Sequence, residues 1–123
     1  MTRRAAAEAL LQTYLAACEA RDVAAIASCF APHAVVMDPT SPRARGRRRI
    51  GAYFHALYDD LADLRLSASS LYWQGEAAAC HWRGHATRRD GGVIDYEGID
   101  VFDLNAAPLI RRMRAFWDPK DFM

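Results

Sequence analysis

The chain has 123 residues, the length of one domain with one hydrophobic core, which leaves no room for a separate cofactor-binding domain. Apolar residues make up 52% of the chain and charged residues 25%, with a formal net charge of +1. This balance excludes a disordered chain and a strongly basic nucleic-acid-binding protein. We therefore predict one globular domain over residues 1–123, with one site.

The cysteines and the N-terminal residues predict the compartment. Cys18, Cys29 and Cys80 lack the paired spacing of a disulfide framework. The first residues are rich in arginine and alanine and include Glu8, so they lack the apolar centre of a secretion signal. No apolar stretch approaches the ~20 residues of a membrane span. We expect a cytoplasmic protein with reduced thiols that does not bind a membrane.

Helical periodicity marks three segments in the first half of the chain. Over residues 4–20, apolar side chains recur at helical spacing, and Tyr14 lies on the apolar face. Asp22 is the predicted N-cap of a short second helix that ends at Pro32. A third amphipathic helix is predicted to begin near Arg47. Its apolar face is predicted to carry Ile50, Tyr53, Phe54, Leu57 and Leu61.

Strand composition marks one early segment and most of the second half. Residues 35–38 are predicted to form a strand that ends at Asp38, because Pro39 disfavours the helical region for the residue before it. A loop is predicted to begin at residues 40–42. Four later strands are predicted at residues 64–73, 76–89, 93–104 and 109–117, separated by turn residues. Three helices followed by an antiparallel meander predict an α+β fold in which a curved sheet wraps around a helix.

Three polar side chains in apolar surroundings are the candidate catalytic residues: Tyr14, Asp38 and Asp100. A phenol and two carboxyl groups around one apolar pocket are suited to moving a proton next to a carbonyl group. Taken singly, each also has a structural interpretation, as a core tyrosine, a turn aspartate before proline and an aspartate on an exposed strand face. Strand alternation places Tyr96, Gly98 and Phe102 on the same face as Asp100.

These residues and their surroundings resemble the steroid delta-isomerases, or ketosteroid isomerases, of the nuclear transport factor 2-like fold. Residues 12–17 resemble the first-helix segment with that family's oxyanion-hole tyrosine. Residues 31–39 resemble its strand ending in the catalytic Asp-Pro, and residues 99–102 with 113–117 resemble the strands with the second oxyanion-hole acid and the aromatic pocket wall. The resemblance implies a cone-shaped, curved mixed or antiparallel sheet wrapped around three N-terminal helices, and a homodimer.

The resemblance also implies a role for each candidate. Asp38 is then the general base that takes a proton beside a ketone and returns it at another carbon, so that a C=C bond moves into conjugation. Tyr14, and an Asp100 kept protonated by burial, donate hydrogen bonds to the oxygen on which negative charge develops. Ketosteroid isomerase is the standard example of this pKa arrangement.

The implied ligand is a hydrophobic small-molecule ketone, and no metal or organic cofactor is implied. The candidate pocket residues are Phe54, Trp82, Phe102, Phe116 and Trp117. Phe54 lies where the resembled family often has a tyrosine that supports the oxyanion-hole phenol, with Tyr53 and Tyr58 nearby.

The strand predicted at residues 76–89 leaves the character of the pocket open. One face carries Trp82, and the other carries His81, Arg83 and His85. An inward Trp82 gives an apolar pocket for a steroid-like ligand, whereas the opposite face gives a polar pocket for an acidic or heavily oxygenated substrate. The cost of burying two histidines and an arginine favours an inward Trp82.

Two other functions remain open for the same residues. A SnoaL-like polyketide cyclase or a dehydratase uses the same kind of acid and base, for example in an aldol closure. A non-enzymatic ligand-binding or dimerisation module is the alternative if Tyr14, Asp38 and Asp100 do not converge.

Two further patterns in the sequence are not assigned a function. His81 with His85, and Cys29 with His33, lack a third metal ligand, so no metal site is predicted. The arginine run at residues 43–49 is predicted to be a solvated loop, with attraction of an anionic substrate or nucleic acid as the alternatives. Nucleic acid is not expected as a partner, because the run lacks interleaved aromatic residues.

Overall fold

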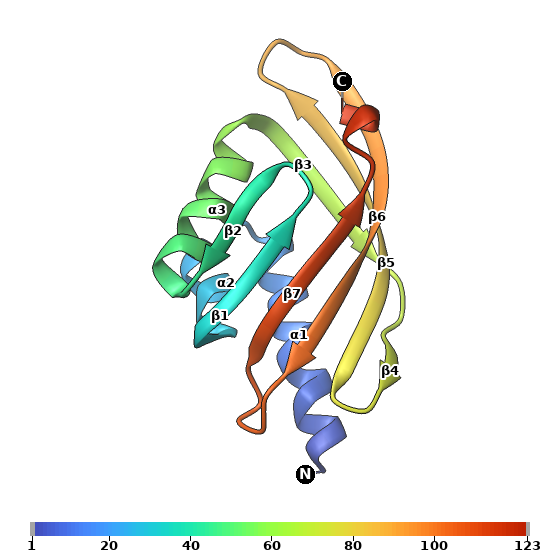
Figure 1. Cartoon of the computed structure of the whole chain (residues 1–123). Coiled ribbons are helices and arrows are strands. Elements are labelled where there is room, and N and C mark those ends of the chain that lie inside the picture. The colour runs from blue at the N-terminus through green and yellow to red at the C-terminus, as the bar shows by residue number, and fades with distance from the viewer. Residues whose placement is uncertain (1, 123) are drawn as a thin grey trace.

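The computed structural model describes residues 2–122. In chain order the elements are α1 (Arg3–Glu19), α2 (Val23–Ser28), β1 (Phe30–Asp38), β2 (Ser41–Arg45), α3 (Arg47–Asp59), β3 (Leu61–Ala68), β4 (Tyr72–Gln74), β5 (Ala77–Arg88), β6 (Val93–Leu104), β7 (Ile110–Trp117) and the 3-10 helix η1 (Pro119–Phe122). The strands form one curved, unclosed mixed sheet in the order β2-β1-β7-β6-β5-β3, with β4 paired to β5, and the α-helices pack against one face of it (Figure 1). This confirms the predicted α+β class.

Capping residues determine where the first two helices begin. The Thr2 side chain accepts a hydrogen bond from the Ala5 amide, and the Asp22 side chain accepts one from the Ala25 amide, so both helices begin at capped positions. The apolar face of α1 buries Leu11 and Tyr14 against the sheet. None of the helices in the described part of the chain is long and apolar enough to cross a membrane.

The first half contains more strand than the sequence predicts. The short helix ends at Ser28, and β1 already begins at Phe30. Residues 40–42, predicted as the start of a loop, instead lead into β2, which forms a hairpin with β1. Pro42 is tolerated there because β2 is an edge strand, where a missing backbone donor leaves no partner unpaired.

The second half differs from the prediction around residues 61–74. Leu61, predicted on the face of the third helix, begins β3 and is buried there. The single strand predicted at residues 64–73 is two strands, β3 and β4, which both pair with the long β5. The break comes at Ser69, whose amide bonds to the His81 carbonyl and whose hydroxyl accepts from the His81 amide.

The pairing of β1 with β7 makes the sheet mixed. The two strands run parallel, with Val36 opposite Met113 and Met37 opposite Arg114. The C-terminal ends of both strands therefore lie at the same end of the sheet. This pairing brings Asp38, early in the chain, next to Trp117 near its C-terminus.

Two glycines make space for aromatic rings between β5 and β6. Gly84 pairs with Tyr96, and a Cβ atom on Gly84 would lie 2.6 Å from Cε1 of the Tyr96 ring. Gly98 pairs with Trp82, and a Cβ atom on Gly98 would lie 2.5 Å from Cζ2 of the Trp82 ring and 2.4 Å from the Phe116 carbonyl oxygen. The rings lie over the glycines. Trp82 and Tyr96 can therefore occupy these positions only because Gly84 and Gly98 have no side chain.

Gly98→Ala is expected to destabilise the fold, because a backbone oxygen and a rigid indole must both move. The expected loss in free energy of unfolding is about 1–3 kcal/mol, as for other overpacked sites. Denaturant unfolding measures it. Gly51→Ala in α3 is the matched control, since its nearest neighbour is 3.9 Å away and alanine favours the helix. Equal stabilities of the two variants would contradict the packing argument.

Candidate active site

A cavity of about 960 Å³ lies between the helices and the concave face of the sheet. Its volume is at the upper end of the range for small-molecule pockets. Residues from α1, α3, η1 and six strands line it. Among the predicted site residues, the lining includes Tyr14, Asp38, Phe54, Trp82, Asp100 and Trp117. The structure thus brings the three candidate catalytic residues to one cavity from α1, β1 and β6.

Asp38 accepts four hydrogen bonds at the end of β1. Oδ1 accepts from the Thr40 amide and the Thr40 hydroxyl, both at 2.9 Å. Oδ2 accepts from the Tyr53 hydroxyl at 2.6 Å and from the Trp117 indole Nε1–H at 3.3 Å. The Thr40 bonds form the turn expected of an aspartate before proline. The other two bonds come from α3 and β7 and fix the carboxylate at the cavity wall.

Asp100 has a different environment. The Trp82 indole donates to Oδ1 over 3.1 Å, and this is the carboxyl's single side-chain donor among the described residues. Burial raises the pKa of Asp100 from its usual value to about 7; the Trp82 bond opposes this rise, and the charge of Asp38 adds to it. Near neutral pH Asp100 therefore holds its proton for much of the time and can act as a hydrogen-bond donor.

Tyr14 is also kept as a donor. Burial raises its pKa well above the usual value, with smaller contributions from Cys18 and Asp100. The hydroxyl donates to Sδ of Met113 over 3.2 Å. A thioether is a weak acceptor, so a ligand oxygen at this position is a better partner. Phe54 contacts the Tyr14 ring edge-on, with centroids 6.4 Å apart, and cannot supply a supporting hydroxyl.

Two predicted pocket residues lie elsewhere. Phe102 is fully buried against Tyr14, with ring centroids 5.4 Å apart, so it supports the phenol from within the core and does not line the cavity. Phe116 is 51% exposed on the opposite face of the sheet. Strand alternation explains this, because Met113, Ala115 and Trp117 occupy the cavity side of β7.

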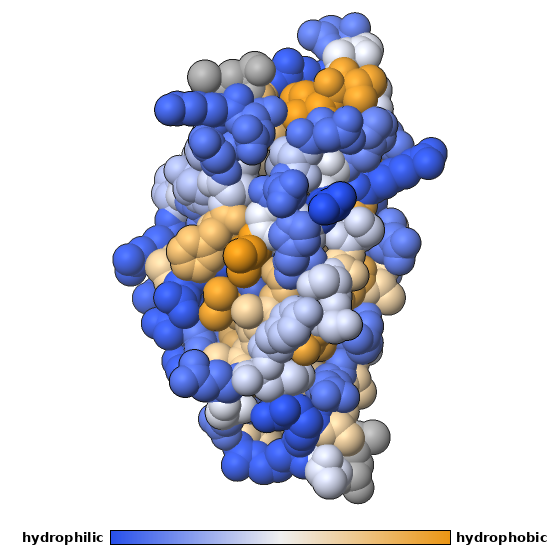
Figure 2. Space-filling model, turned by 90° about the vertical axis from the view of Figure 1, so that its right-hand side faces the viewer, coloured by the Kyte–Doolittle hydropathy of each residue, from blue (hydrophilic) through white to orange (hydrophobic). Residues whose placement is uncertain are grey.

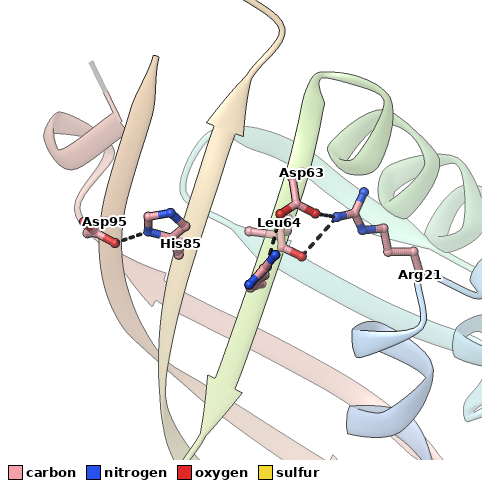
Figure 3. A network of polar contacts seen from close by, with 6 residues as sticks. Arg21, Asp63, Leu64, His85 and Asp95 are labelled. Carbon is pink, nitrogen blue, oxygen red and sulfur yellow. Dashed lines mark hydrogen bonds and ion pairs between the residues drawn. The ribbon is translucent and has the colours of Figure 1, made fainter. Parts of the chain in front are cut away.

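The orientation of β5 makes the cavity wall apolar. Trp82 lines the cavity, whereas His81, Arg83 and His85 point away from it. His81 Nε2 lies 2.8 Å from a Glu97 carboxylate oxygen. His85 Nδ1 lies 2.6 Å from an Asp95 carboxylate oxygen, a pair that Figure 3 shows. Across residues 2–122, no cluster of three or more His, Cys, Asp or Glu side chains is arranged to hold a metal ion.

Sequence reasoning placed Tyr53 on the apolar face of its helix but gave it no role. In the structure its ring lines the cavity and its hydroxyl bonds to Asp38. Burial raises its pKa, with a further contribution from the Asp38 charge, so it too remains a donor. The helical periodicity signals an inward tyrosine, but its partner is 15 residues away and follows only from the packing of α3 on the β1–β2 hairpin.

Tyr96 and Phe122 complete the aromatic wall. Tyr96 contacts Trp82, Trp117 and Phe122 edge-on, with centroid distances of 5.2, 5.8 and 4.8 Å. Burial raises the pKa of Tyr96 to about 12. Its position on the face of Asp100 follows from the predicted alternation. Phe122 lies in η1, a helix of four residues that is too short to show helical periodicity in the sequence.

The Trp82 indole N–H signal is expected to report the protonation of Asp100. Its nuclear magnetic resonance shift should titrate with a midpoint near pH 7, because the donor's partner changes from a carboxyl to a carboxylate. The internal control is the indole N–H signal of Trp73, whose ring lies 4.4 Å from the Arg4 guanidinium. In Asp100→Asn the Trp82 titration should disappear. A Trp82 midpoint near pH 4 in the unmodified protein would contradict the buried, protonated Asp100.

The sequence is similar to a known domain family and to a known enzyme. Residues 11–113 match the SnoaL-like domain. A steroid delta-isomerase of Nocardioides simplex is 34% identical over 119 residues, covering 94% of this chain and 93% of that protein. Both matches confirm the resemblance seen in the sequence.

Similar solved structures share the fold. The epoxide hydrolase/cyclase-like enzyme SalBIII, which has a role in pyran ring formation in the polyether salinomycin, has a TM-score of 0.84 at 22% identity, covering 96% of this chain and 95% of its own. An NTF2-like protein of unknown function from Burkholderia pseudomallei has a TM-score of 0.88 at 14% identity, covering 99% and 95%. The chain belongs to the SnoaL-like family of the nuclear transport factor 2-like fold and is a relative of the steroid delta-isomerases.

Proposed function

We propose that this protein is a cofactor-independent isomerase that moves a C=C bond into conjugation with the ketone of a hydrophobic, steroid-like compound. The family supports an isomerase or cyclase function, and the named relative supports the isomerase. The observation that carries the proposal is the convergence of Tyr14, Asp38 and Asp100 on one apolar cavity. This convergence favours an enzyme over a non-enzymatic binding module.

In the proposed reaction Asp38 is the base. Its carboxylate takes a proton from the carbon between the ketone and the C=C bond, and the C–H electrons move into a dienolate. Tyr14 and protonated Asp100 donate hydrogen bonds to the dienolate oxygen, where the negative charge develops. The protonated Asp38 then returns the proton to the far carbon of the dienolate. The bond shift is complete, and the base is regenerated.

The apolar wall contributes to the same chemistry. Trp82, Trp117 and Tyr96 line the same cavity as the two carboxyl groups, and a ligand packed on these rings displaces water from it. In such a site, hydrogen bonds to a developing charge are stronger than in water. The rings also provide flat surfaces for a fused-ring ketone, which is why a hydrophobic ketone is the proposed partner.

The isomerisation is measured by the ultraviolet absorbance that appears when a β,γ-unsaturated 3-ketosteroid becomes conjugated. Asp38→Asn is expected to lower turnover by about 10²–10⁴-fold, because it removes the base. Tyr14→Phe is expected to lower it by about 10²–10³-fold, the usual effect of losing one oxyanion donor. Absence of conjugation with the unmodified protein at high concentration would reject the steroid isomerase proposal.

A second candidate function, a cyclase or dehydratase, is favoured by the pKa of Asp100. A carboxyl with a pKa of about 7 can deliver its proton at neutral pH as well as share it. Asp100→Asn separates the two functions, since an amide still donates a hydrogen bond to an enolate but has no proton to transfer. If Asp100→Asn keeps part of the turnover, Asp100 acts as an oxyanion donor. If the turnover is lost completely, Asp100 acts as a general acid.

We also propose that the protein is a homodimer that pairs through the outer face of the sheet. Ile99 and Phe116 are directly opposite each other on β6 and β7, and they are 46% and 51% exposed. Figure 2 shows apolar side chains gathered near the middle of this side of the molecule. Exposed apolar patches of this kind mark interaction surfaces.

Phe116→Asp is expected to convert the dimer to a monomer, because it places a charge in the centre of the exposed patch that pairing would bury. Sedimentation equilibrium measures the mass. Val93→Asp is the matched control, since Val93 is 59% exposed at the start of β6, away from the Ile99–Phe116 pair. A monomeric unmodified protein, or a dimeric Phe116→Asp variant, would contradict pairing through this face.

A further inference from the structure

Two members of the arginine run at residues 43–49 line the cavity. The run is not the solvated loop that the sequence predicts, because it spans the end of β2 and the start of α3. The cavity lining includes Arg43 from β2 and Arg49 from α3. The other arginines of the run lie outside the lining: Arg45, Arg47 and Arg48.

The cavity reaches the surface beside these two arginines. Arg49, Ala52, Tyr53 and Ala56 follow one another at helical spacing on the side of α3 that lines the cavity. Arg49 and both alanines are exposed, and so is Arg43 on the neighbouring hairpin. The small alanine side chains leave room for a ligand along α3, with an arginine on either side of the opening.

Arg43 and Arg49 have no protein partner among residues 2–122. Neither guanidinium lies within ion-pair distance of a carboxylate, whereas Arg21 and Arg112 each pair with an aspartate. Asp38 lines the same cavity but accepts its four hydrogen bonds from uncharged donors. The two guanidinium groups are therefore free to bind an anion, and their planar N–H donors match carboxylate, sulfate or phosphate oxygens.

The negative charges on the exposed cavity lining lie toward the other end of α3. Asp60 follows Arg49 by eleven residues, which is roughly 16 Å at the rise of an α-helix. Glu19 ends α1, and the bond from the Tyr58 hydroxyl to the Cys18 carbonyl holds that end of α1 beside the C-terminal part of α3. The opening is thus positive near the start of α3 and negative near its end.

We propose that the substrate is a hydrophobic ketone with an anionic group at the end opposite the ketone, and that Arg43 and Arg49 bind this group. The ketone then lies at Tyr14 and Asp100, and the ring system lies along the aromatic wall. The cavity of about 960 Å³ leaves room for a charged substituent beyond the rings. This inference rests on the proposed function and adds the charge of the substrate to it.

The binding test uses two ligands that differ only in charge. One is a conjugated 3-ketosteroid with a carboxylate at the end of the ring system opposite the ketone, and the other is its methyl ester. Equilibrium dialysis measures both dissociation constants. The acid is expected to bind roughly tenfold more tightly than the ester, and added salt should reduce this ratio.

A pair of double variants tests whether the two lining arginines cause the preference. Arg43→Gln with Arg49→Gln should bring the ratio of the two dissociation constants close to one. Arg45→Gln with Arg48→Gln is the matched control, since it removes the same charge from the same two elements outside the lining. It should keep most of the preference. The ratio cancels any change in the pocket that weakens both ligands equally.

A steroid sulfate, compared with the corresponding alcohol, distinguishes the two kinds of anionic group. A preference for either anion that depends on Arg43 and Arg49 supports the proposal, and the larger preference identifies the group. A ratio close to one for both pairs of ligands would overturn it. Equal losses of preference in the two double variants would also overturn it, because a general positive field then explains the binding.

The dialysis measurement is independent of turnover, so the two proposals can fail separately. An arginine-dependent preference in a protein that does not isomerise the β,γ-unsaturated ketosteroid would reject the isomerase and keep the anion site. Isomerisation of the ketosteroid without any preference for the anionic ligands would support the reaction and reject the role of Arg43 and Arg49.

Discussion

Two carboxyl groups that face one low-dielectric cavity repel each other when both are ionised, so the surroundings of each group matter. The structure gives the two groups different sets of hydrogen-bond donors. Asp38 receives four donors, from its own turn, from α3 and from β7. Asp100 receives one donor from Trp82 and is otherwise surrounded by apolar groups that raise its pKa to about 7. Two carboxyl groups with different surroundings therefore face the same cavity, as the proposed proton transfer requires.

The sheet topology brings the indole donors to the two carboxyl groups. The parallel pairing of β1 with β7 places the Trp117 indole beside Asp38 and the Met113 sulfur beside Tyr14. The absence of a side chain at Gly98 lets the Trp82 ring lie over the sheet and reach Asp100. Each of the two carboxyl groups is thus bonded to an indole from a neighbouring strand. The aromatic residues of the cavity hold the acids in place as well as enclosing a ligand.

Much of the fold could be predicted because its signals are local. The capped first helices, the strand ending at Asp38 and the long strands of the second half all have periodicity or turn residues within a few positions. The hairpin strand β2 was missed, because an edge strand containing Pro42 has the composition of a loop. The split between β3 and β4 was missed because Ser69 and its neighbours interrupt the strand through bonds to β5.

The site was less predictable than the fold. Strand alternation identified the face of Asp100, but it could not show that Phe102 lies beneath Tyr14 in the core, since depth along a strand depends on where α1 crosses the sheet. Phe116 was predicted in the pocket because residues 113–117 resemble the family's aromatic pocket wall, although Phe116 alternates away from Trp117. The bond between Tyr53 and Asp38 joins two elements whose relative position no local pattern specifies.

In the proposed reaction, Asp38 removes a proton from the carbon beside a carbonyl group bound at Tyr14 and Asp100. The most direct measurement is the exchange of α-protons of a hydrophobic cyclic ketone for deuterium, followed by nuclear magnetic resonance in heavy water. This measurement requires no double-bond shift. Exchange is expected to be much faster with the unmodified protein than with Asp38→Asn, which should match the buffer background. Equal exchange rates for the two proteins would contradict the assignment of Asp38 as the base.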